Sequence, residues 1–358
     1  MKRSAALMGT IITIHVDDAD DGPTDGARGS DQRIRERQEA VERAFGWFRE
    51  VEACCSRFDA DSELMQLVAR PGVPVRASRT LLHAVRLALA VAEETGGAFD
   101  PTVGAEVASR GFDRHYRTGQ RPRLPIVPDD RATYRDVAVD LDAETITLGC
   151  PLLLDLGAVA KGLAIDLAAR ELRVWKNYAV DAGGDLYVAG RGPGGGPWSV
   201  GIRHPRDDHR LIETLSASDC AVCTSGDYER MGANAQGESG HHILDPRTGA
   251  TAVRAASVTV VASTAMLADA LATAAFVLGP PEGIHLLERH GVDGLIVAPN
   301  LERYVTQGFL GPGSTLRPHA QRPADHRPRA AGGPGRIRRA PGAAGPGPAG
   351  RRARRGAR

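Results

Sequence analysis

The sequence lacks a long apolar run, has few aromatic residues and carries almost no net charge. Aromatic residues make up 4% of its 358 residues, and the formal net charge is +1. This balance gives no reason to expect a nucleic acid or a membrane surface as a partner. No stretch is long and apolar enough to span a bilayer, and the segment before Asp17 lacks the continuous apolar core of a secretory signal. We therefore expect no membrane span and a cytoplasmic location.

Cysteine is also scarce, and its pattern excludes two kinds of cross-link. The total of five is odd, and Cys54 and Cys55 are adjacent. Cys220 and Cys223 form a single CxxC pair without a second pair, so neither a disulfide framework nor a zinc site is favoured. We expect all five cysteines to be reduced.

The small net charge hides an uneven distribution along the chain. Residues 317–358 are rich in Arg, Pro and Gly and nearly free of acids, so the remainder is acidic. This tail has almost no large apolar residues and cannot bury enough surface to offset the entropy lost on ordering. We predict a folded domain over 1–316 and a disordered basic tail over 317–358. A dispensable tail is favoured over an RNA-binding arm.

The apolar pattern predicts interleaved helices and strands. A first strand is expected over 11–16, followed by an acidic, Gly-rich loop over about 17–33. Helices are predicted over 34–55, 63–68, 78–95, 159–174, 265–277 and 281–290. Strands are predicted over 137–139, 145–148, 151–154, 178–180, 186–188, 198–202, 221–224, 257–261 and, last, 294–298. The Gly-rich segment 190–196 precedes a strand, so it is interpreted as a hairpin loop and not a dinucleotide loop. Because strands and helices do not alternate strictly, the fold class is α+β.

The segment from Leu154 to Gly162 has the pattern of a phosphate site. A strand leads through Gly157 into a helix, and Lys161 follows in the first turn. The free N–H groups and the dipole of a helix start favour an anion, which Lys161 could also reach. Asp155, at the strand end, could bind a hydroxyl, an amine or a metal-bound water. An ordinary strand–helix junction with a surface lysine is the alternative.

Asp269 and Thr273 form a candidate cation site. They are four residues apart in an apolar, Ala-rich helix, so their side-chain oxygens share one face. A carboxylate buried in such a helix needs a partner, and Mg²⁺ takes oxygen ligands of this kind. The alternative is an exposed Asp269 near the helix start.

A histidine pair precedes a turn signature. His241 and His242 come before Leu244, and residues 245–249 read Asp-Pro-Arg-Thr-Gly. Adjacent strand residues point to opposite faces, so the two histidines are not expected to share a metal. One of them could act as a general base, although structural turn residues are the default.

Eight segments in order resemble the FAD:protein FMN transferase family of the ApbE type, over roughly residues 6–298. They are Met8-Gly9-Thr10, Ser56-Arg57-Phe58 with Asp61-Ser62-Glu63-Leu64, Gly97-Ala98-Phe99-Asp100-Pro101-Thr102, Asp155 through Gly162, Asp181-Ala182-Gly183-Gly184-Asp185, Thr224-Ser225-Gly226-Asp227-Tyr228, His242 through Gly249, and Ala268-Asp269 through Thr273.

The resemblance implies one compact FAD-binding unit built from duplicated T-fold-like halves. It places the flavin and ribityl part of FAD near Met8, Phe58, Ala98, Phe99 and Asp100. It also implies FAD contacts from Asp155, Lys161 and the backbone at Leu244. Mg²⁺ would be held by the Ala158 carbonyl and the side chains of Asp269 and Thr273.

The activity implied by the resemblance is transfer of FMN from FAD to a Thr or Ser hydroxyl of an acceptor protein, with release of AMP. His242 is the candidate for removing the proton of that hydroxyl. Two alternatives use the same site: an FAD-binding or storage protein without transfer, and a Mg²⁺-dependent FAD pyrophosphatase that releases FMN and AMP.

Overall fold

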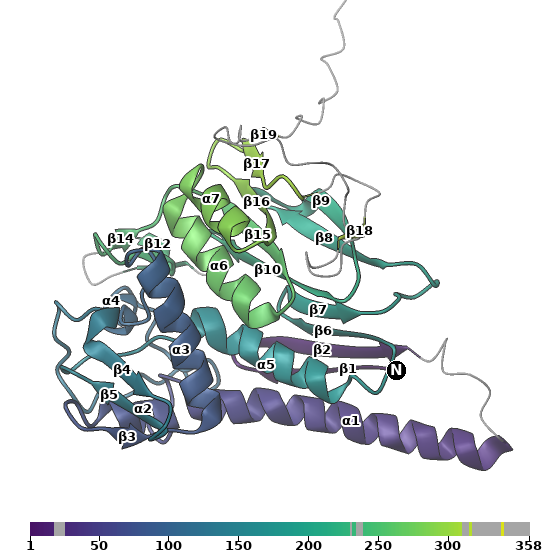
Figure 1. The fold of residues 1–358 in the computed structure, drawn as a ribbon, viewed down its shortest axis with the longest axis horizontal. Helices are drawn as coiled ribbons and strands as arrows, with labels where there is room; N and C mark the ends of the chain where they lie inside the picture. The colour runs from purple at the N-terminus through teal and green to yellow at the C-terminus, as the bar shows by residue number, and fades with distance from the viewer. Residues whose placement is uncertain (18–25, 230, 234–238, 310–314, 317–337, 340–358) are drawn as a thin grey trace, which may run out of the picture.

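The fold is built around a nine-stranded sheet, seen in a computed structural model that describes residues 1–17, 26–229, 231–233, 239–309, 315–316 and 338–339 (Figure 1). Its strand order is β1-β2-β6-β7-β10-β15-β16-β17-β19, and every neighbouring pair is antiparallel. The strands are β1 (Lys2–Leu7), β2 (Thr10–Asp17), β6 (Asn177–Ala182), β7 (Asp185–Ala189), β10 (Cys220–Gly226), β15 (Ser257–Ala262), β16 (Asp293–Val297), β17 (Arg303–Val305) and β19 (Arg338–Arg339). With the helices around it, this sheet makes the fold α+β, as predicted.

Four helices pack on one face of this sheet, and a small sheet packs on the other. The helices are α1 (Gly26–Cys55), α5 (Gly157–Glu171), α6 (Ala265–Leu278) and α7 (Glu282–Arg289). The small sheet has the order β18-β9-β8, with β8 (Trp198–His204), β9 (Asp207–Ala217) and β18 (Thr315–Leu316). A smaller apolar cluster around Trp198 and Phe309 lies between the two sheets.

Strand β10 shows why the central strands read as continuous apolar runs. Successive side chains of a strand point to opposite faces. Ala221 and Cys223 belong to the main core under the helices, whereas Cys220 and Val222 belong to the smaller cluster. Burial on both faces leaves no polar alternation along this strand. All five cysteines are described, and none forms a disulfide.

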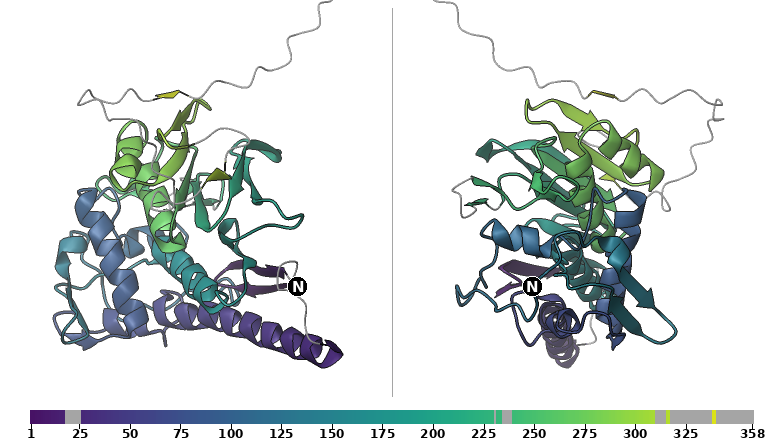
Figure 2. Two further views of the ribbon diagram at one scale, coloured as in Figure 1. Left: turned by 45° about the vertical axis from the view of Figure 1, so that its right-hand side comes forward. Right: turned by 90° about the vertical axis from the view of Figure 1, so that its left-hand side faces the viewer.

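The segment between α1 and α5 forms a small unit beside the helices, which we call the inserted unit (residues 56–156), and its apolar side chains join the main core. It holds α2 (Glu63–Val68), α3 (Arg79–Glu94), α4 (Gly104–Ser109), the turn η1 (Tyr134–Asp136) and the sheet β3 (Val75–Arg76), β5 (Thr145–Leu148) and β4 (Val137–Asp140). It lies to the left in Figure 1 and in the left panel of Figure 2. The hydroxyl of Ser62 accepts the N–H of Met65 at 3.1 Å, so Ser62 is the N-cap of α2.

Several predicted boundaries are wrong. Helix α1 begins at Gly26 and not at residue 34, so it extends beyond the apolar stripe that predicted it, and Arg33 and Arg37 lie over the Trp175 ring. The part of the predicted loop over 18–25 lies outside the described residues. Residues 152–154 are buried but form no strand apart from one bridge between Leu153 and Val103, so their apolar run reflects burial alone.

The strand predictions contain errors of placement. Strand β8 does not continue the main sheet, so residues 190–196 connect two sheets and do not close a hairpin. Strand β1 was not predicted, and β16 is followed by β17. Two short hairpins complete the described strands, β11 (Met231–Ala233) with β12 (Ser239–His241) and β13 (Leu244–Asp245) with β14 (Ala250–Thr251). Apart from β19, the predicted tail lies outside the described residues.

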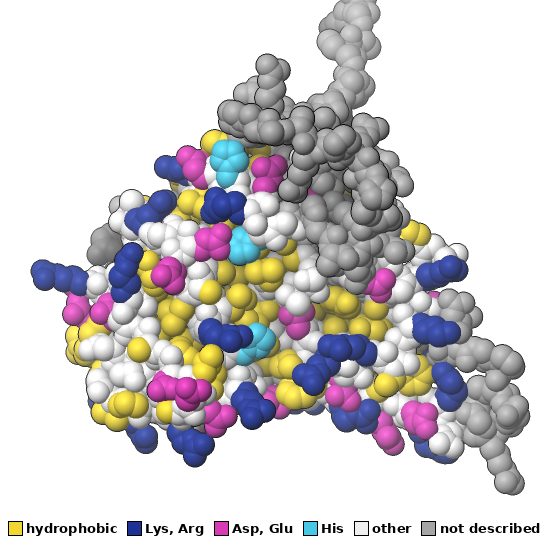
Figure 3. All heavy atoms as spheres, in the orientation of Figure 1, with side chains coloured by type: hydrophobic (Ala, Val, Ile, Leu, Met, Phe, Trp, Pro, Cys, Tyr) yellow, Lys and Arg dark blue, Asp and Glu magenta, His cyan; other side chains and the backbone are white. Residues whose placement is uncertain are grey.

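On the face shown in Figure 3, basic and acidic side chains are interspersed. Within the described part of the chain, no helix combines the length and the apolar character needed to cross a membrane.

Candidate active site

Two turns lie side by side where strands of the main sheet end. The β1–β2 turn at Met8 and Gly9 and the β6–β7 turn at Gly183 and Gly184 are neighbours because β2 pairs with β6. Gly183 has φ +69°, and a Cβ there would collide with the side chain of Thr10. Only glycine fits both the backbone angle and the space. The end of β10 lies at the same end of the strands, because β10 pairs with β7.

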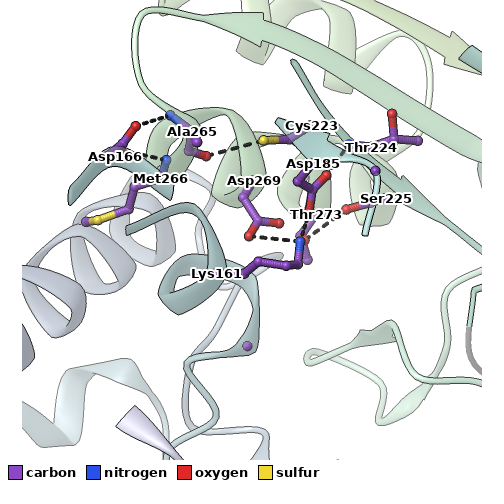
Figure 4. A network of polar contacts seen from close by, with 12 residues as sticks. Lys161, Asp166, Asp185, Cys223, Thr224, Ser225, Ala265, Met266, Asp269 and Thr273 are labelled. Carbon is purple, nitrogen blue, oxygen red and sulfur yellow. Dashed lines mark hydrogen bonds and ion pairs between the residues drawn. The ribbon is translucent and has the colours of Figure 1, made fainter. Parts of the chain in front are cut away.

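Lys161, Asp185 and Asp269 form a buried ionic cluster at this end of the strands (Figure 4). The ammonium of Lys161 pairs with Asp185, and its Nζ lies 3.5 Å from Asp269 Oδ2. The side chains of Asp185 and Asp269 are 5% and 8% exposed, compared with 23% for Lys161. Carboxylates this buried are costly without a cation, so Lys161 stabilises both.

Hydroxyl groups from β10 and α6 extend the cluster. The Thr273 and Ser225 hydroxyl oxygens are 3.1 Å apart, and the Thr224 N–H donates to Asp185 Oδ1 at 2.8 Å. Asp269 and Thr273 therefore face the same site from α6, as the helical spacing predicted. Asp185 and Ser225 were not among the predicted site residues. Their only signal in the sequence was their place in two of the family-like segments.

The oxygen donors of the cluster suit a hard cation. Asp269, Thr273 and Asp185 offer carboxylate and hydroxyl oxygens, which Mg²⁺ prefers. Among the residues that the structure describes, no group of three or more His, Cys, Asp or Glu side chains could hold a metal by itself. Mg²⁺ takes few protein ligands and completes its shell with water or phosphate oxygens. Ala158 lies in the first turn of α5, three residues before Lys161.

Asp155 connects the start of α5 to the inserted unit. Its Oδ1 accepts the Gly157 N–H at 2.8 Å, and its Oδ2 pairs with Arg57 Nε at 2.8 Å. Arg57 is 5% exposed and also donates to the Phe112 carbonyl at 2.6 Å. Its guanidinium lies 4.1 Å from the centre of the Phe58 ring. These contacts orient Asp155 and Phe58 at the helix start. A contact of Asp155 with FAD stays a prediction.

Residues 98–100 are buried inside the inserted unit. Ala98 and Phe99 are 0% and 5% exposed. The Asp100 carboxylate accepts the N–H and hydroxyl of Thr102 at 2.8 and 2.7 Å and the Tyr134 N–H at 3.0 Å. These contacts hold the turn between α3 and α4 in place.

Met8 and Phe58 are the partly exposed members of the predicted flavin set. Met8 has φ +51° and donates its N–H to Glu52 Oε1 at 3.2 Å. The contacts with flavin that are predicted for Met8, Phe58 and residues 98–100 stay predictions.

The two adjacent histidines have different environments. His241 is buried, with Nε2 2.8 Å from the Ala252 carbonyl oxygen and Nδ1 accepting the Ile243 N–H at 3.3 Å. Burial lowers the pKa of His241, because it penalises the charged ring. His242 is half-buried, and its ring lies edge-on to Phe112 with 6.1 Å between centroids. His241 therefore has a structural role, which leaves His242 as the candidate base.

The turn after the histidines has the predicted form. Leu244 is buried and pairs with Thr251, and Arg247 forms an ion pair with Asp245 at 2.7 Å. The pairing holds the Leu244 backbone in a fixed register.

The family model for the ApbE family matches residues 8–296. The FAD:protein FMN transferase of Treponema pallidum is 35% identical over 304 residues, which cover 76% of this chain and 80% of that protein. The FAD:protein FMN transferase of Haemophilus influenzae is 29% identical over 316 residues, which cover 85% and 88%.

Solved structures agree with the sequence comparisons. The ApbE protein of Thermotoga maritima has a TM-score of 0.71 and 30% identity, covering 86% of this chain and 97% of that one. The flavin transferase ApbE of Vibrio cholerae has a TM-score of 0.68 and 28% identity, with the same coverage.

Proposed function

The chain belongs to the ApbE family, and from that premise we propose that it transfers FMN from FAD to an acceptor protein. The observation that carries the proposal is the convergence of Lys161, Asp269 and Thr273 from two helices. The cluster offers a cation for phosphate oxygens and oxygen ligands for a metal. A diphosphate ester such as FAD needs both in order to lose a charged leaving group.

Lys161 and the start of α5 would hold the diphosphate of FAD. The ammonium lies in the first turns of α5, where the helix dipole also favours an anion. Asp155 fixes that helix start through the Gly157 N–H. The flavin and ribityl part of FAD would then extend toward Met8, Phe58 and residues 98–100, with Asp155 and the Leu244 backbone as further contacts.

Asp269 and Thr273, with the Ala158 carbonyl, would hold Mg²⁺. Bound there, Mg²⁺ supplies positive charge for the phosphate oxygens of the leaving AMP. The position of the Lys161 ammonium against Asp269 supports this assignment, because it marks a place where the protein already stabilises a cation. Asp185 and Ser225 orient Lys161 and Thr273.

The acceptor is proposed to be a Thr or Ser hydroxyl of another protein. Its oxygen forms a bond to the phosphorus of the FMN half, and the bond from that phosphorus to the AMP phosphate breaks. His242 is the proposed base that takes the proton of the hydroxyl, because its ring is partly exposed and histidine is the side chain that most often acts as a general base.

The order of the elements supports duplicated T-fold-like halves. The first half is a hairpin, two helices and a second hairpin: β1 and β2, α1 and α5, then β6 and β7. The inserted unit interrupts it between the helices. The second half repeats this order with β10 and β15, α6 and α7, then β16 and β17. The strands of each half are consecutive in the sheet, and β7 joins β10.

Intact mass of an acceptor domain that carries a flavinylation motif tests the activity. The domain is incubated with this protein, FAD and Mg²⁺, and a matched acceptor has its Thr or Ser replaced by Ala. We expect a gain of one FMN moiety that EDTA and the Ala acceptor both abolish. Free FMN and AMP with an unmodified acceptor would indicate a pyrophosphatase. Bound FAD without either product would indicate a storage protein.

A further inference from the structure

The first turn of α6 is held by a side chain from a different helix. Thr264, the residue before α6, is extended (φ −134°, ψ 146°) and makes no side-chain cap. Instead, Asp166 of α5 accepts the Ala265 N–H at Oδ1 (2.7 Å) and the Met266 N–H at Oδ2 (3.0 Å), as Figure 4 shows. Both oxygens of one carboxylate thus satisfy N–H groups that a helix start leaves without internal partners.

The two helices also touch through their backbones. A Cβ on Gly162 would lie 2.5 Å from the Ala265 carbonyl oxygen and from the Met266 Cα. Gly162 and Asp166 are four residues apart, so both lie on the face of α5 that meets α6. Glycine permits the close approach, and the Asp166 carboxylate fixes which two N–H groups α5 meets. The contact therefore has a defined position along both helices.

This contact lies between the residues of the proposed site. Lys161 is adjacent to Gly162 on α5, and Asp269 is one turn beyond Ala265 on α6. Any shift of α6 along α5 changes the separation of Lys161 and Asp269, which is 3.5 Å between Nζ and Oδ2. Thr273, a further turn along α6, would move with Asp269. The helix contact is therefore the part of the fold that sets the spacing of the site.

We propose that Asp166 is a positioning residue that holds Asp269 and Thr273 at metal-binding distance from α5. The proposal rests on the function proposed above, because it concerns the same metal site. Burial raises the pKa of Asp166 to about 6, so the carboxylate is ionised at neutral pH. An ionised acceptor forms shorter and stronger hydrogen bonds to N–H groups than a neutral one does.

Asp166 would act on the metal site by positioning α6 and not by contact with the metal. Side chains that orient metal ligands typically change metal affinity by about 10- to 100-fold when they are removed. Misplacement of a reacting group by about 1 Å can lower a rate on the order of 100-fold. Removal of Asp166 should therefore weaken metal binding and transfer together.

The test separates positioning from simple helix capping. Asp166→Ala removes both the cap of α6 and its link to α5. The double variant Asp166→Ala with Thr264→Asp restores a local cap, since Thr264 is exposed and already has extended backbone angles. It does not restore the link between the helices. Asp166→Asn, which keeps one acceptor oxygen, serves if Asp166→Ala does not fold.

Mn²⁺ serves as the metal probe, and electron paramagnetic resonance measures its binding in the presence of FAD. The melting temperature of each variant is measured alongside. We expect Asp166→Ala to bind Mn²⁺ about 10- to 100-fold more weakly and to melt earlier. The double variant should recover the melting temperature but not the Mn²⁺ affinity. Asp166→Asn should fall between wild type and Asp166→Ala in Mn²⁺ affinity.

Two results would overturn the proposal. One is wild-type Mn²⁺ affinity in Asp166→Ala or, where that variant does not fold, in Asp166→Asn. The other is recovery of both properties in the double variant, since Asp166 would then be only a helix cap. A wild-type protein that binds no Mn²⁺ with FAD present would instead refute the metal site itself. Failure of the acceptor mass assay with normal Mn²⁺ binding would refute the transferase function alone.

Discussion

Lys161 and Asp269 meet across two helices, with the ammonium nitrogen 3.5 Å from a carboxylate oxygen of a side chain that is 8% exposed. The same ammonium pairs with Asp185. Lys161 would therefore have two roles in the proposed site: it would bind the phosphates of FAD, and it is a cation next to the carboxylate that would bind Mg²⁺. The two roles make opposite predictions for the two ligands.

Replacement of Lys161 by Met should weaken FAD binding. In the absence of FAD, it should strengthen Mg²⁺ binding. A lost hydrogen bond between charged groups costs about 1.5–3 kcal/mol, which is roughly 10- to 100-fold in FAD affinity. Removing a positive charge beside Asp269 lowers the repulsion that a divalent cation meets. Calorimetric titration with each ligand measures both effects, and Lys176→Met, on an exposed residue before β6, is the matched control. Unchanged FAD affinity would contradict the anion site.

Replacement of Asp269 by Ala should abolish transfer while the protein remains folded. Asp269 is the only carboxylate assigned to the metal, and Lys161 keeps Asp185 as a partner when Asp269 is removed. The acceptor mass assay measures transfer, and thermal unfolding measures the fold. Asp142→Ala, at an exposed turn, controls for the loss of a carboxylate. Undiminished transfer by Asp269→Ala in Mg²⁺ would show that the metal site is elsewhere.

Replacement of His242 by Asn should slow transfer without changing FAD affinity. A positioned general base contributes about 10²- to 10⁴-fold to a rate, whereas the proposed FAD contacts do not include His242. Single-turnover transfer and FAD titration separate the two quantities. His209→Asn, on the exposed part of β9, is the control. If FAD affinity falls as far as the rate does, His242 is a binding residue and not the base.

His241 should make the fold sensitive to mild acid. Burial lowers its pKa in the folded state, while the unfolded chain keeps a value near 6.5. The unfolded state therefore binds the proton more readily, so the contribution is complete above about pH 6.5 and is lost as the pH falls through the lowered pKa. His241→Gln should show a smaller loss of unfolding free energy between pH 7 and 5 in urea titrations. Equal slopes for both proteins would exclude this role.

The sequence predicted the parts of the site that depend on local spacing. Asp269 and Thr273 share a helix face because they are four residues apart, and Lys161 follows a glycine at a helix start, so both features could be recognised without a fold, although the strand predicted before that helix does not form. Asp166 and Asp185 could not be recognised in this way. Asp166 acts on α6 from α5, a hundred residues earlier in the chain, and Asp185 meets Lys161 because α5 packs against β7. Such contacts arise only from tertiary packing.

The errors in the fold have the same origin. Strand β8 has a normal strand pattern, but nothing in that pattern says which of two sheets it joins. Helix α1 starts eight residues before the predicted start, at Gly26, and Arg33 in this extension lies over the ring of Trp175, which is far along the chain. The cytoplasmic location, the domain boundary at residue 316 and the disorder of the tail stay predictions.

The ion pair between Arg57 and Asp155 has a consequence for how this fold can vary. The two residues lie at the two ends of the inserted unit, directly after α1 and directly before α5, and they are joined at 2.8 Å. When an ion pair joins the two ends of a segment, the length of the segment can vary at little cost, because the entropic cost of closing a loop rises only slowly with its number of residues. The Arg57–Asp155 pair holds the two ends of the inserted unit together in this way. Its loops can gain or lose residues while the ion pair keeps the start of α5, and Lys161 with it, in place.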